Sequence, residues 1–410
     1  MTKVILLAAD LGEYDIERSM SELRALAESA GMEPVAEVVQ KKAAIEKATY
    51  LGEGRLAEAR LLAYNLQAEL AIFDCELSGS QIRNLEQILE VPVIDRTMLI
   101  LEIFASRATT NEGKLQTELA TLRYRLPRLQ GLGTSLGRQG GGGEGGGGGR
   151  RGAGESKLEY DKRHIRRRID ALSENLAEME KRRAETRKSR AKNGVPVIAL
   201  VGYTNVGKSS LLNRLCGAEV MAADMLFATL DPTARKFTLP SGQNAIFIDT
   251  VGFVSRLPHN LVEAFKSTLE EARYADIILK VCDLADEEAA AQLEVTDQVL
   301  QQIGCAEITQ LTVYNKCDCV QTNAMLFDKN AIQVSAATGE GLDALVQLLD
   351  EKLADRVRNI EVLLPYDKLA AATPMRERGT VLQEEYRDGG LYLKGIVKKE
   401  DFHYFESYLL

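Results

Sequence analysis

The sequence predicts an α/β protein that carries a long helical hairpin and a small α+β appendage. Three observations lead to this fold class. Short apolar runs alternate with helix-length segments in residues 1–108 and again in 194–358, as expected of βαβ units with a mostly parallel sheet. Two longer helical patterns flank a run of glycines within 109–193. Finally, 410 residues are too many for one ordinary core.

Composition indicates a globular chain with one unusual region of charge. Of its residues, 45% are hydrophobic and 27% are charged. No apolar stretch reaches the roughly 18 residues of a membrane span, and the first apolar run is followed at once by acidic residues, unlike a signal peptide. Six scattered cysteines fit reduced thiols. We therefore expect a cytoplasmic protein without a membrane span, and a monomer.

The elements of the first domain, residues 1–108, follow one another in a regular order. The strands VILLAA and PVAEVVQ enclose a helix near 16–30, and a helix near 54–68 leads to the strand LAIFD. A helix over 78–89 then precedes the strand VPVID. Ser78 followed by Gln81 predicts a capping box at the start of that helix.

Residues 109–193 predict two helices with apolar stripes, joined by a flexible loop. The stripes have the spacing of coiled coils and comprise Leu115, Leu119, Leu122, Leu126 and Leu129, then Ile165, Ile169, Leu172, Leu176 and Met179. Nine of the ten residues 140–149 are glycine, which disfavours any folded element. An antiparallel hairpin with a glycine-rich tip explains both features, while composition alone also allows a plain linker between domains.

The second helix of this region is basic in an otherwise acidic chain. The net charge is −9, yet residues 150–192 contain fifteen Lys and Arg against eight Asp and Glu. A basic arm on an acidic protein indicates one element that faces a polyanion. The candidate RNA-binding residues are Arg150, Arg151, Lys162, Arg163, Arg166, Arg167 and Arg168.

The domain over 194–358 contains the strands VIALVG, NAIFIDTVG, DIILKVCD, ITQLTVYNK and AIQVSA, and the appendage covers 359–410. The first strand of the 194–358 domain leads into a G-x-x-x-x-G-K-S motif, which is a P-loop. The motif lies between a strand and a helix, the context that it requires. Glycines let backbone N–H groups surround phosphates, and the helix N-terminus adds positive charge. The motif comprises Gly202, Tyr203, Thr204, Asn205, Val206, Gly207, Lys208 and Ser209.

Three further motifs follow the P-loop in the order expected of a GTPase, which makes 194–358 a P-loop GTPase domain. Asp249, Thr250, Val251 and Gly252 form D-x-x-G, with Asp249 placed to hold Mg²⁺ through water and Gly252 to contact the γ-phosphate. A carboxylate after the fourth strand can accept from both guanine N–H groups, which adenine lacks. The carboxylate is that of Asp318 in an N-K-x-D motif, which comprises Asn315, Lys316, Cys317 and Asp318. The loop expected to contact the base comprises Ser335, Ala336 and Ala337.

A mobile loop between the P-loop and D-x-x-G is expected to complete the site. It comprises Phe227, Ala228, Thr229, Leu230 and Asp231. Thr229 is the expected Mg²⁺ ligand beside Ser209, with Thr233 as the alternative, although both could be ordinary loop residues. Lys208, Thr229 and Gly252 are the expected catalytic residues. Many GTPases place a water-orienting Gln after D-x-x-G, but Phe253 stands there, so we expect slow hydrolysis that a partner stimulates.

The combination of motifs resembles the HflX family of ribosome-associated GTPases. The resemblance rests on YLGEGRLAEA, DRTMLILEIFASRA, GKLQTELATLRYRLPRL, GAGESKLEYDKRHIRRRI and the nucleotide motifs, and it spans residues 4–345. It implies GTP or GDP with Mg²⁺ as ligands, binding to the large ribosomal subunit and its RNA, and the splitting of stalled ribosomes under stress. The chain departs from the family at 152–163, where G-P-G-E-T-Q-L-E-x-D-R-R is usual, and in its purer glycine run.

Two other functions remain open at the level of sequence. The hairpin could bind ribosomal RNA with a mainly structural nucleotide, in which case affinity would depend on salt and not on the nucleotide. Alternatively, the protein could be a GTPase of ribosome assembly. A modification enzyme is disfavoured because the three histidines are scattered and no second catalytic cluster is evident.

Overall fold

A computed structural model describes residues 1–129, 152–193, 195–217, 226–227, 233–256, 271–320, 330–354, 357–399 and 401–410. The chain divides into two compact units, each described below by itself. Unit 1 comprises Met1–Met179, Met225–Leu230 and Arg256–Phe265, and unit 2 comprises Glu180–Asp224, Asp231–Ser255 and Lys266–Leu410.

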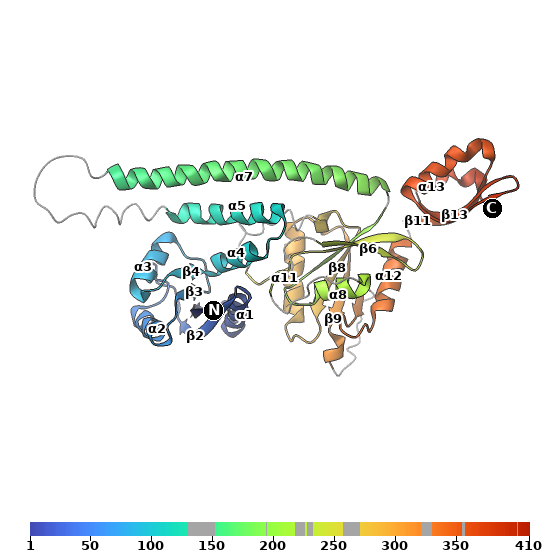
Figure 1. The fold of residues 1–410 in the computed structure, drawn as a ribbon. Coiled ribbons are helices and arrows are strands. Elements are labelled where there is room, and N and C mark those ends of the chain that lie inside the picture. The colour runs from blue at the N-terminus through green and yellow to red at the C-terminus, as the bar shows by residue number, and fades with distance from the viewer. Residues whose placement is uncertain are drawn as a thin grey trace, which may run out of the picture. The chain divides into compact units, whose positions relative to one another are not determined.

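Unit 1 is built on a parallel four-stranded sheet (Figure 1). Its strands are β1 (Thr2–Asp10), β2 (Met32–Lys41), β3 (Leu70–Phe73) and β4 (Val93–Asp95). The strand order β2-β1-β3-β4 confirms the predicted βαβ alternation, since every neighbouring pair is parallel. The order also reverses between β1 and β3, and open α/β sheets commonly bind ligands outside the carboxyl ends of strands at such a point.

The helices of unit 1 cover this sheet and extend beyond it. They are α1 (Ile16–Ser29), α2 (Glu53–Leu66), α3 (Gly79–Leu89), α4 (Arg96–Arg107) and α5 (Asn111–Arg128). Residues of α2 and α3 pack with alternate residues of β1 in one apolar cluster that includes Ile5, Leu7, Leu56 and Leu85. The predicted capping box of α3 is present, with Ser78 and Gln81 bonded reciprocally.

The helical hairpin consists of α5 and the 42-residue helix α7 (Gly152–Asn193), which run side by side in Figure 1. Arg168 on α7 forms two hydrogen bonds with Glu118 on α5, at 2.7 and 2.8 Å. Leu172 is the fully buried member of the predicted α7 stripe. On α5 the buried face also includes Thr117, Ala120 and Tyr124, because this helix packs on α4 as well. The glycine-rich segment 140–149 lies outside the described residues.

Unit 2 contains a six-stranded sheet in the order β10-β9-β8-β5-β7-β6. Its strands are β5 (Val197–Gly202), β6 (Thr233–Thr238), β7 (Asn244–Asp249), β8 (Ile277–Asp283), β9 (Thr309–Asn315) and β10 (Ala331–Gln333). Five strands are mutually parallel and β6, which the sequence analysis did not identify, is antiparallel to β7. The helices are α8 (Lys208–Cys216), α11 (Ala289–Gln302), α12 (Leu342–Ala354) and the 3-10 turn η2 (Cys317–Cys319).

The C-terminal part of unit 2 forms a three-stranded antiparallel sheet in the order β11-β13-β12, consistent with a small α+β appendage. Its elements are β11 (Val357–Leu364), η3 (Tyr366–Ala372), α13 (Thr373–Arg378), β12 (Thr380–Arg387), β13 (Gly390–Lys398), η4 (Phe402–Tyr404) and η5 (Glu406–Tyr408). The sheet has its own core, which includes Val362, Met375, Leu393 and Phe405. Within the described ranges, no helix is long and apolar enough to cross a membrane.

The burial of Leu172 predicts that this side chain holds α7 on α5. Leu172→Ala removes a fully buried side chain and should cost about 2–4 kcal/mol locally. Amide hydrogen exchange of α7 should therefore accelerate, while exchange in the β5–β9 sheet should not change. Leu176→Ala, at a half-buried position of the same stripe, is the control and should have a smaller effect. Equal exchange in all three proteins would contradict this assignment.

Candidate functional site

The site lies at one edge of the sheet of unit 2. Strands β5, β7, β8, β9 and β10 are parallel, so their carboxyl ends meet at the same edge. The P-loop follows β5, the D-x-x-G motif ends β7, and the N-K-x-D motif ends β9. The loop that begins at Ser335 follows β10. Topology therefore brings together four motifs that lie up to about 130 residues apart in sequence.

The P-loop requires glycine at its first position because the backbone passes very close to a neighbouring strand. Gly202 has φ +152°, and a Cβ placed on it would lie 2.1 Å from the carbonyl oxygen of Val281 on β8. Helix α8 begins directly after Gly207, at Lys208. Its first N–H groups lack partners within the helix and form a site suited to phosphate.

Lys208 is buried at the start of α8, with 6% of its surface exposed. Its ammonium group donates to the carbonyl oxygens of Gly202 at 3.1 Å and Tyr203 at 2.7 Å. Burial lowers the pKa of Lys208 to about 8, and the nearby Asp249 carboxylate partly opposes that shift. The Lys208 ammonium is thus poorly solvated by water, and an anionic ligand beside it would stabilise its charged form.

Ser209 and Asp249 meet beside this lysine. The Ser209 hydroxyl donates to Asp249 Oδ2 at 2.6 Å, and Asp249 is fully buried at the end of β7. A hydroxyl and a carboxylate are hard oxygen donors of the kind Mg²⁺ prefers. Because Mg²⁺ in nucleotide sites usually binds one or two protein groups together with phosphates and waters, this pair fits it.

The residues after Asp249 fold back along the P-loop. The N–H of Phe253 donates to the Gly202 carbonyl at 3.0 Å, and the N–H of Thr204 donates to the Phe253 carbonyl at 2.7 Å. A Cβ on Gly252 would lie 2.7 Å from Thr204 Cγ2 and 3.0 Å from Lys208 Nζ. The Phe253 ring is buried, with 1% exposed. Gly252 therefore allows a close approach of the D-x-x-G segment to the lysine.

Asn315 joins the P-loop to the loop after β10. Its side-chain amide donates to the Val206 carbonyl at 2.8 Å, and its side-chain oxygen accepts from the Ala336 N–H at 3.0 Å. The side chain is 2% exposed, so both bonds are made away from water. The N-K-x-D motif predicts Asn315 in the nucleotide site, but the motif does not indicate this bridging role.

Of the two carboxylates beside Asn315, that of Asp318 is exposed. Lys316 forms an ion pair with Asp283 at the end of β8, at 2.6 Å. Asp318 is exposed, and a hydrogen bond from the Ser335 hydroxyl keeps the pKa of the Asp318 carboxyl below its usual value. An ionised acceptor beside an exposed loop can bind paired N–H donors. Asp283 was not predicted as a site residue, although its position at the end of a parallel strand could have indicated one.

The mobile-loop prediction falls mainly outside the described residues, which include neither Ala228, Thr229, Leu230 nor Asp231. Phe227 belongs to unit 1, where its buried ring packs edge-to-face on Phe104 with centroids 4.6 Å apart. The described contacts of Phe227 are thus packing contacts. Thr233, the alternative metal ligand, begins β6 and pairs with Asp249 in the strand register.

The candidate RNA-binding residues fall into three groups. Arg150 and Arg151 lie outside the described residues. Arg163, Arg166 and Arg167 are exposed on α7. Lys162 pairs with Glu159 on the same helix, and the guanidinium of Arg168 is engaged by Glu118. Arg168 therefore has a structural partner within the hairpin, a pairing that sequence spacing alone could not reveal.

Comparison with known families matches the chain almost from end to end. The matching family models are described as GTP-binding GTPase N-terminal over residues 17–105, GTP-binding GTPase Middle Region over 107–190, 50S ribosome-binding GTPase over 197–316, and HflX C-terminal domain over 321–403. These segments leave few residues of the chain outside a match.

Three similar curated proteins carry the name GTPase HflX. GTPase HflX of Caldanaerobacter subterraneus subsp. tengcongensis is 47% identical over 96% of this chain and 91% of its own length. GTPase HflX of Lacrimispora saccharolytica is 45% identical, with 98% and 94% covered. GTPase HflX of Escherichia coli is 43% identical, with 86% and 83% covered.

The bridging bonds of Asn315 predict that this side chain stabilises the arrangement of two loops. Asn315→Ala leaves the Val206 carbonyl and the Ala336 N–H without these bonds, a cost of about 1–3 kcal/mol. Affinity for GDP should fall roughly 5- to 100-fold, as measured by titration of a fluorescent GDP. Thr309→Ala, at the exposed opposite end of β9, is the matched control. Unchanged affinity in Asn315→Ala would show that the bridge does not shape the site.

Proposed function

The chain belongs to the HflX family of GTPases, and we propose that it binds GTP with Mg²⁺ at the four loops of unit 2 and uses the nucleotide to control its association with the large ribosomal subunit. One observation carries the proposal. Three groups lie at one edge of the sheet. They are the P-loop lysine, which suits phosphate, the Ser209–Asp249 pair, which suits Mg²⁺, and the Asn315–Asp318 motif, which suits the base.

Phosphate binding is assigned to the P-loop. The N–H groups of 203–209 and the Lys208 ammonium would contact the β- and γ-phosphates. Ser209 and Asp249, the latter through water, would hold Mg²⁺, which when bound neutralises developing charge on the phosphates. Their 2.6 Å hydrogen bond supports this assignment, because it brings both oxygens to the same place beside Lys208.

Base recognition is assigned to Asp318, with Ser335 and Ala336 along the edge of the base. The Asp318 carboxylate, whose pKa lies below its usual value because of the hydrogen bond from Ser335, can accept from both the ring N–H and the exocyclic amine of guanine. Adenine would leave this acceptor unpaired, which disfavours its binding strongly. The Asn315 bridge supports the assignment, because it ties this loop to the phosphate loop.

Catalysis is assigned to Lys208, Gly252 and Thr229, without a side chain that positions water at 253. The Phe253 ring is buried and its backbone is bonded to the P-loop, so it offers no polar group to the attacking water. We therefore expect a bound partner to complete the arrangement. Thr229 would join the metal in the GTP form and release it after hydrolysis.

The large ribosomal subunit is the proposed partner, in the cytoplasm. The family model that matches 197–316 is described as a 50S ribosome-binding GTPase, and the exposed Arg163, Arg166 and Arg167 present positive charge along α7. Ribosomal RNA supplies the complementary phosphates. In this proposal GTP favours binding, hydrolysis favours release, and the work done is the splitting of stalled ribosomes under stress.

Asp318 allows a direct test of the base assignment. Xanthine carries a carbonyl oxygen where guanine carries the exocyclic amine, and an Asn side chain can donate to that oxygen. Asp318→Asn should therefore lose GDP affinity by about 100-fold or more and gain affinity for xanthosine diphosphate. Competition binding against a fluorescent nucleotide measures both. If Asp318→Asn kept the wild-type order of preference, another group would read the base.

The role of Phe253 and the partner can be tested together. GTP hydrolysis by the purified protein should be slow, and added large ribosomal subunits should stimulate it about 10-fold or more, as partners that complete a GTPase site do. Small subunits at the same concentration are the control. Fast hydrolysis by the protein alone would refute the argument from Phe253, whereas equal rates with both subunits would remove the large subunit as activator.

A further inference from the structure

Asp283 and Lys316 lie at neighbouring strand ends in unit 2. In the strand register, Asp283 at the end of β8 stands directly opposite Asn315, the last residue of β9. The N–H of Leu284 donates to the Asn315 carbonyl at 2.8 Å, which continues the pairing beyond the two strands. Lys316 has φ +63°, a left-handed conformation that turns the chain from β9 into η2. The sheet therefore fixes Asp283 beside the N-K-x-D motif.

The two oxygens of the Asp283 carboxylate have different partners. Oδ1 accepts from the N–H of Ala285 at 2.9 Å, in a turn that Asp and Asn side chains both form. Oδ2 pairs with the Lys316 ammonium at 2.6 Å. Because the Asp283 side chain is only 16% exposed, water and salt screen this ion pair less than an ordinary surface pair. Asp283 thus binds the ammonium in one place.

The Asp318 carboxylate lies in the turn that follows Lys316. A hydrogen bond from Ser335 is the main reason why the pKa of the Asp318 carboxyl is lowered, and the positive charge of Lys316 contributes in smaller measure. The Cys319 thiol also donates to Asp318 Oδ2 at 3.7 Å. Lys316 is therefore near enough to attract Asp318, although its ammonium is bound by Asp283.

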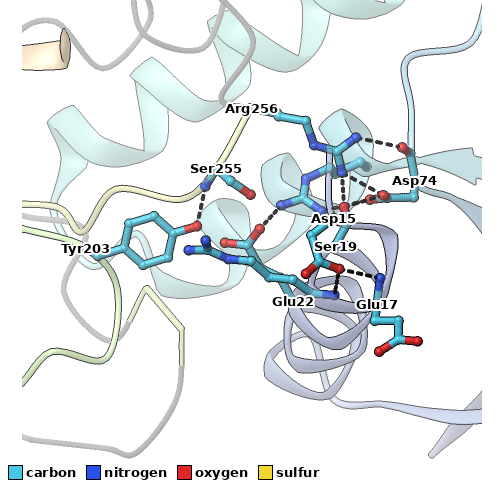
Figure 2. A network of polar contacts seen from close by, with 10 residues as sticks. Asp15, Glu17, Ser19, Glu22, Asp74, Tyr203, Ser255 and Arg256 are labelled. Atoms are coloured by element: carbon cyan, nitrogen blue, oxygen red, sulfur yellow. Dashed lines mark hydrogen bonds and ion pairs between the residues drawn. The ribbon is translucent and has the colours of Figure 1, made fainter. Parts of the chain in front are cut away.

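A carboxylate in unit 1 is bonded to basic side chains through both of its oxygens. Asp74 follows β3 and is fully buried. Its Oδ1 accepts from Arg96 at 2.7 Å and its Oδ2 from Arg256 at 2.6 Å, the latter contact being drawn in Figure 2. Such a carboxylate is a structural ion-pair partner. In unit 2 two carboxylates have separate roles, since Asp283 binds the cation and Asp318 is exposed.

We propose that Asp283 is a positioning residue for guanine recognition, because it binds the Lys316 ammonium and so keeps this cation from pairing with Asp318. This inference rests on the proposed assignment of the base to Asp318. Cys317 alone separates Lys316 from Asp318, so a released ammonium would compete for this carboxylate at a high effective concentration. Guanine offers neutral N–H donors, which form weaker hydrogen bonds to a carboxylate than a charged donor does.

Inosine diphosphate separates base recognition from general affinity. Hypoxanthine keeps the ring N–H of guanine but lacks the exocyclic amine. The ratio of the affinities for GDP and inosine diphosphate therefore measures the second hydrogen bond to Asp318. This ratio is preferable to the GDP affinity alone, because removal of a negative charge favours every nucleoside diphosphate alike. Competition against a fluorescent GDP in the presence of Mg²⁺ measures both affinities.

Asp283→Asn should lower this ratio roughly 10-fold, because Asn retains the turn to Ala285 and loses only the charge that binds Lys316. In a Lys316→Met background the same change should not alter the ratio, because no ammonium remains. Asp297→Asn, which removes an ion pair with Lys280 of β8, is the matched control and should keep the wild-type ratio. An unchanged ratio in Asp283→Asn, or an equal fall in the Lys316→Met background, would overturn the proposal.

Salt distinguishes competition by Lys316 from structural damage. A pair between the released ammonium and the exposed Asp318 would be screened by salt, so the ratio in Asp283→Asn should recover toward the wild-type value at about 1 M NaCl. A ratio that stayed low at every salt concentration would contradict the proposal. Asp318→Ala tests the underlying assignment separately, because a preference for GDP over inosine diphosphate retained in that variant would refute the base assignment itself.

Discussion

The two hydrogen bonds of the Asn315 side chain hold together the loops on which the rest of the site depends. One reaches the P-loop at Val206 and the other reaches the loop after β10 at Ala336. Because Asn315 ends β9, a buried parallel strand, its position is fixed by the sheet rather than by the loops. The phosphate end and the base end of the site thereby share one rigid support, which is what discrimination between bases requires.

The sheet of unit 2 could be predicted from sequence because its motifs occur only between particular strands and helices. A P-loop needs a strand before it and a helix after it, and 197–216 has both. Strand β6 was missed because most of its residues are exposed and it is antiparallel to β7, so it has neither the apolar run nor the following helix that mark a parallel strand. Asp283 ends the predicted strand DIILKVCD, and this position was the available signal; it was missed because the residue belongs to no nucleotide-binding motif, and its ion pair with Lys316 becomes evident only in the structure.

Contacts that depend on long sequence separation could not be predicted. Asp74 and Arg256 are 182 residues apart and neither belongs to a recognisable pattern. The same holds for Glu118 and Arg168. Arg168 is one of the expected RNA-binding residues, and its guanidinium forms an ion pair within the hairpin. The helical conformation of the basic segment was predicted correctly from sequence. Only the structure distinguishes Arg168, which pairs with α5, from the exposed residues Arg163, Arg166 and Arg167.

The central claim is that these four loops form one site selective for guanine nucleotides. Calorimetric titration of the full-length protein with GDP and with ADP, both with Mg²⁺, tests it most directly. We expect GDP to bind with one-to-one stoichiometry and at least about 1,000-fold more tightly than ADP, because only guanine pairs with the Asp318 carboxylate. Equal affinity for the two nucleotides, or no binding of GDP, would contradict it.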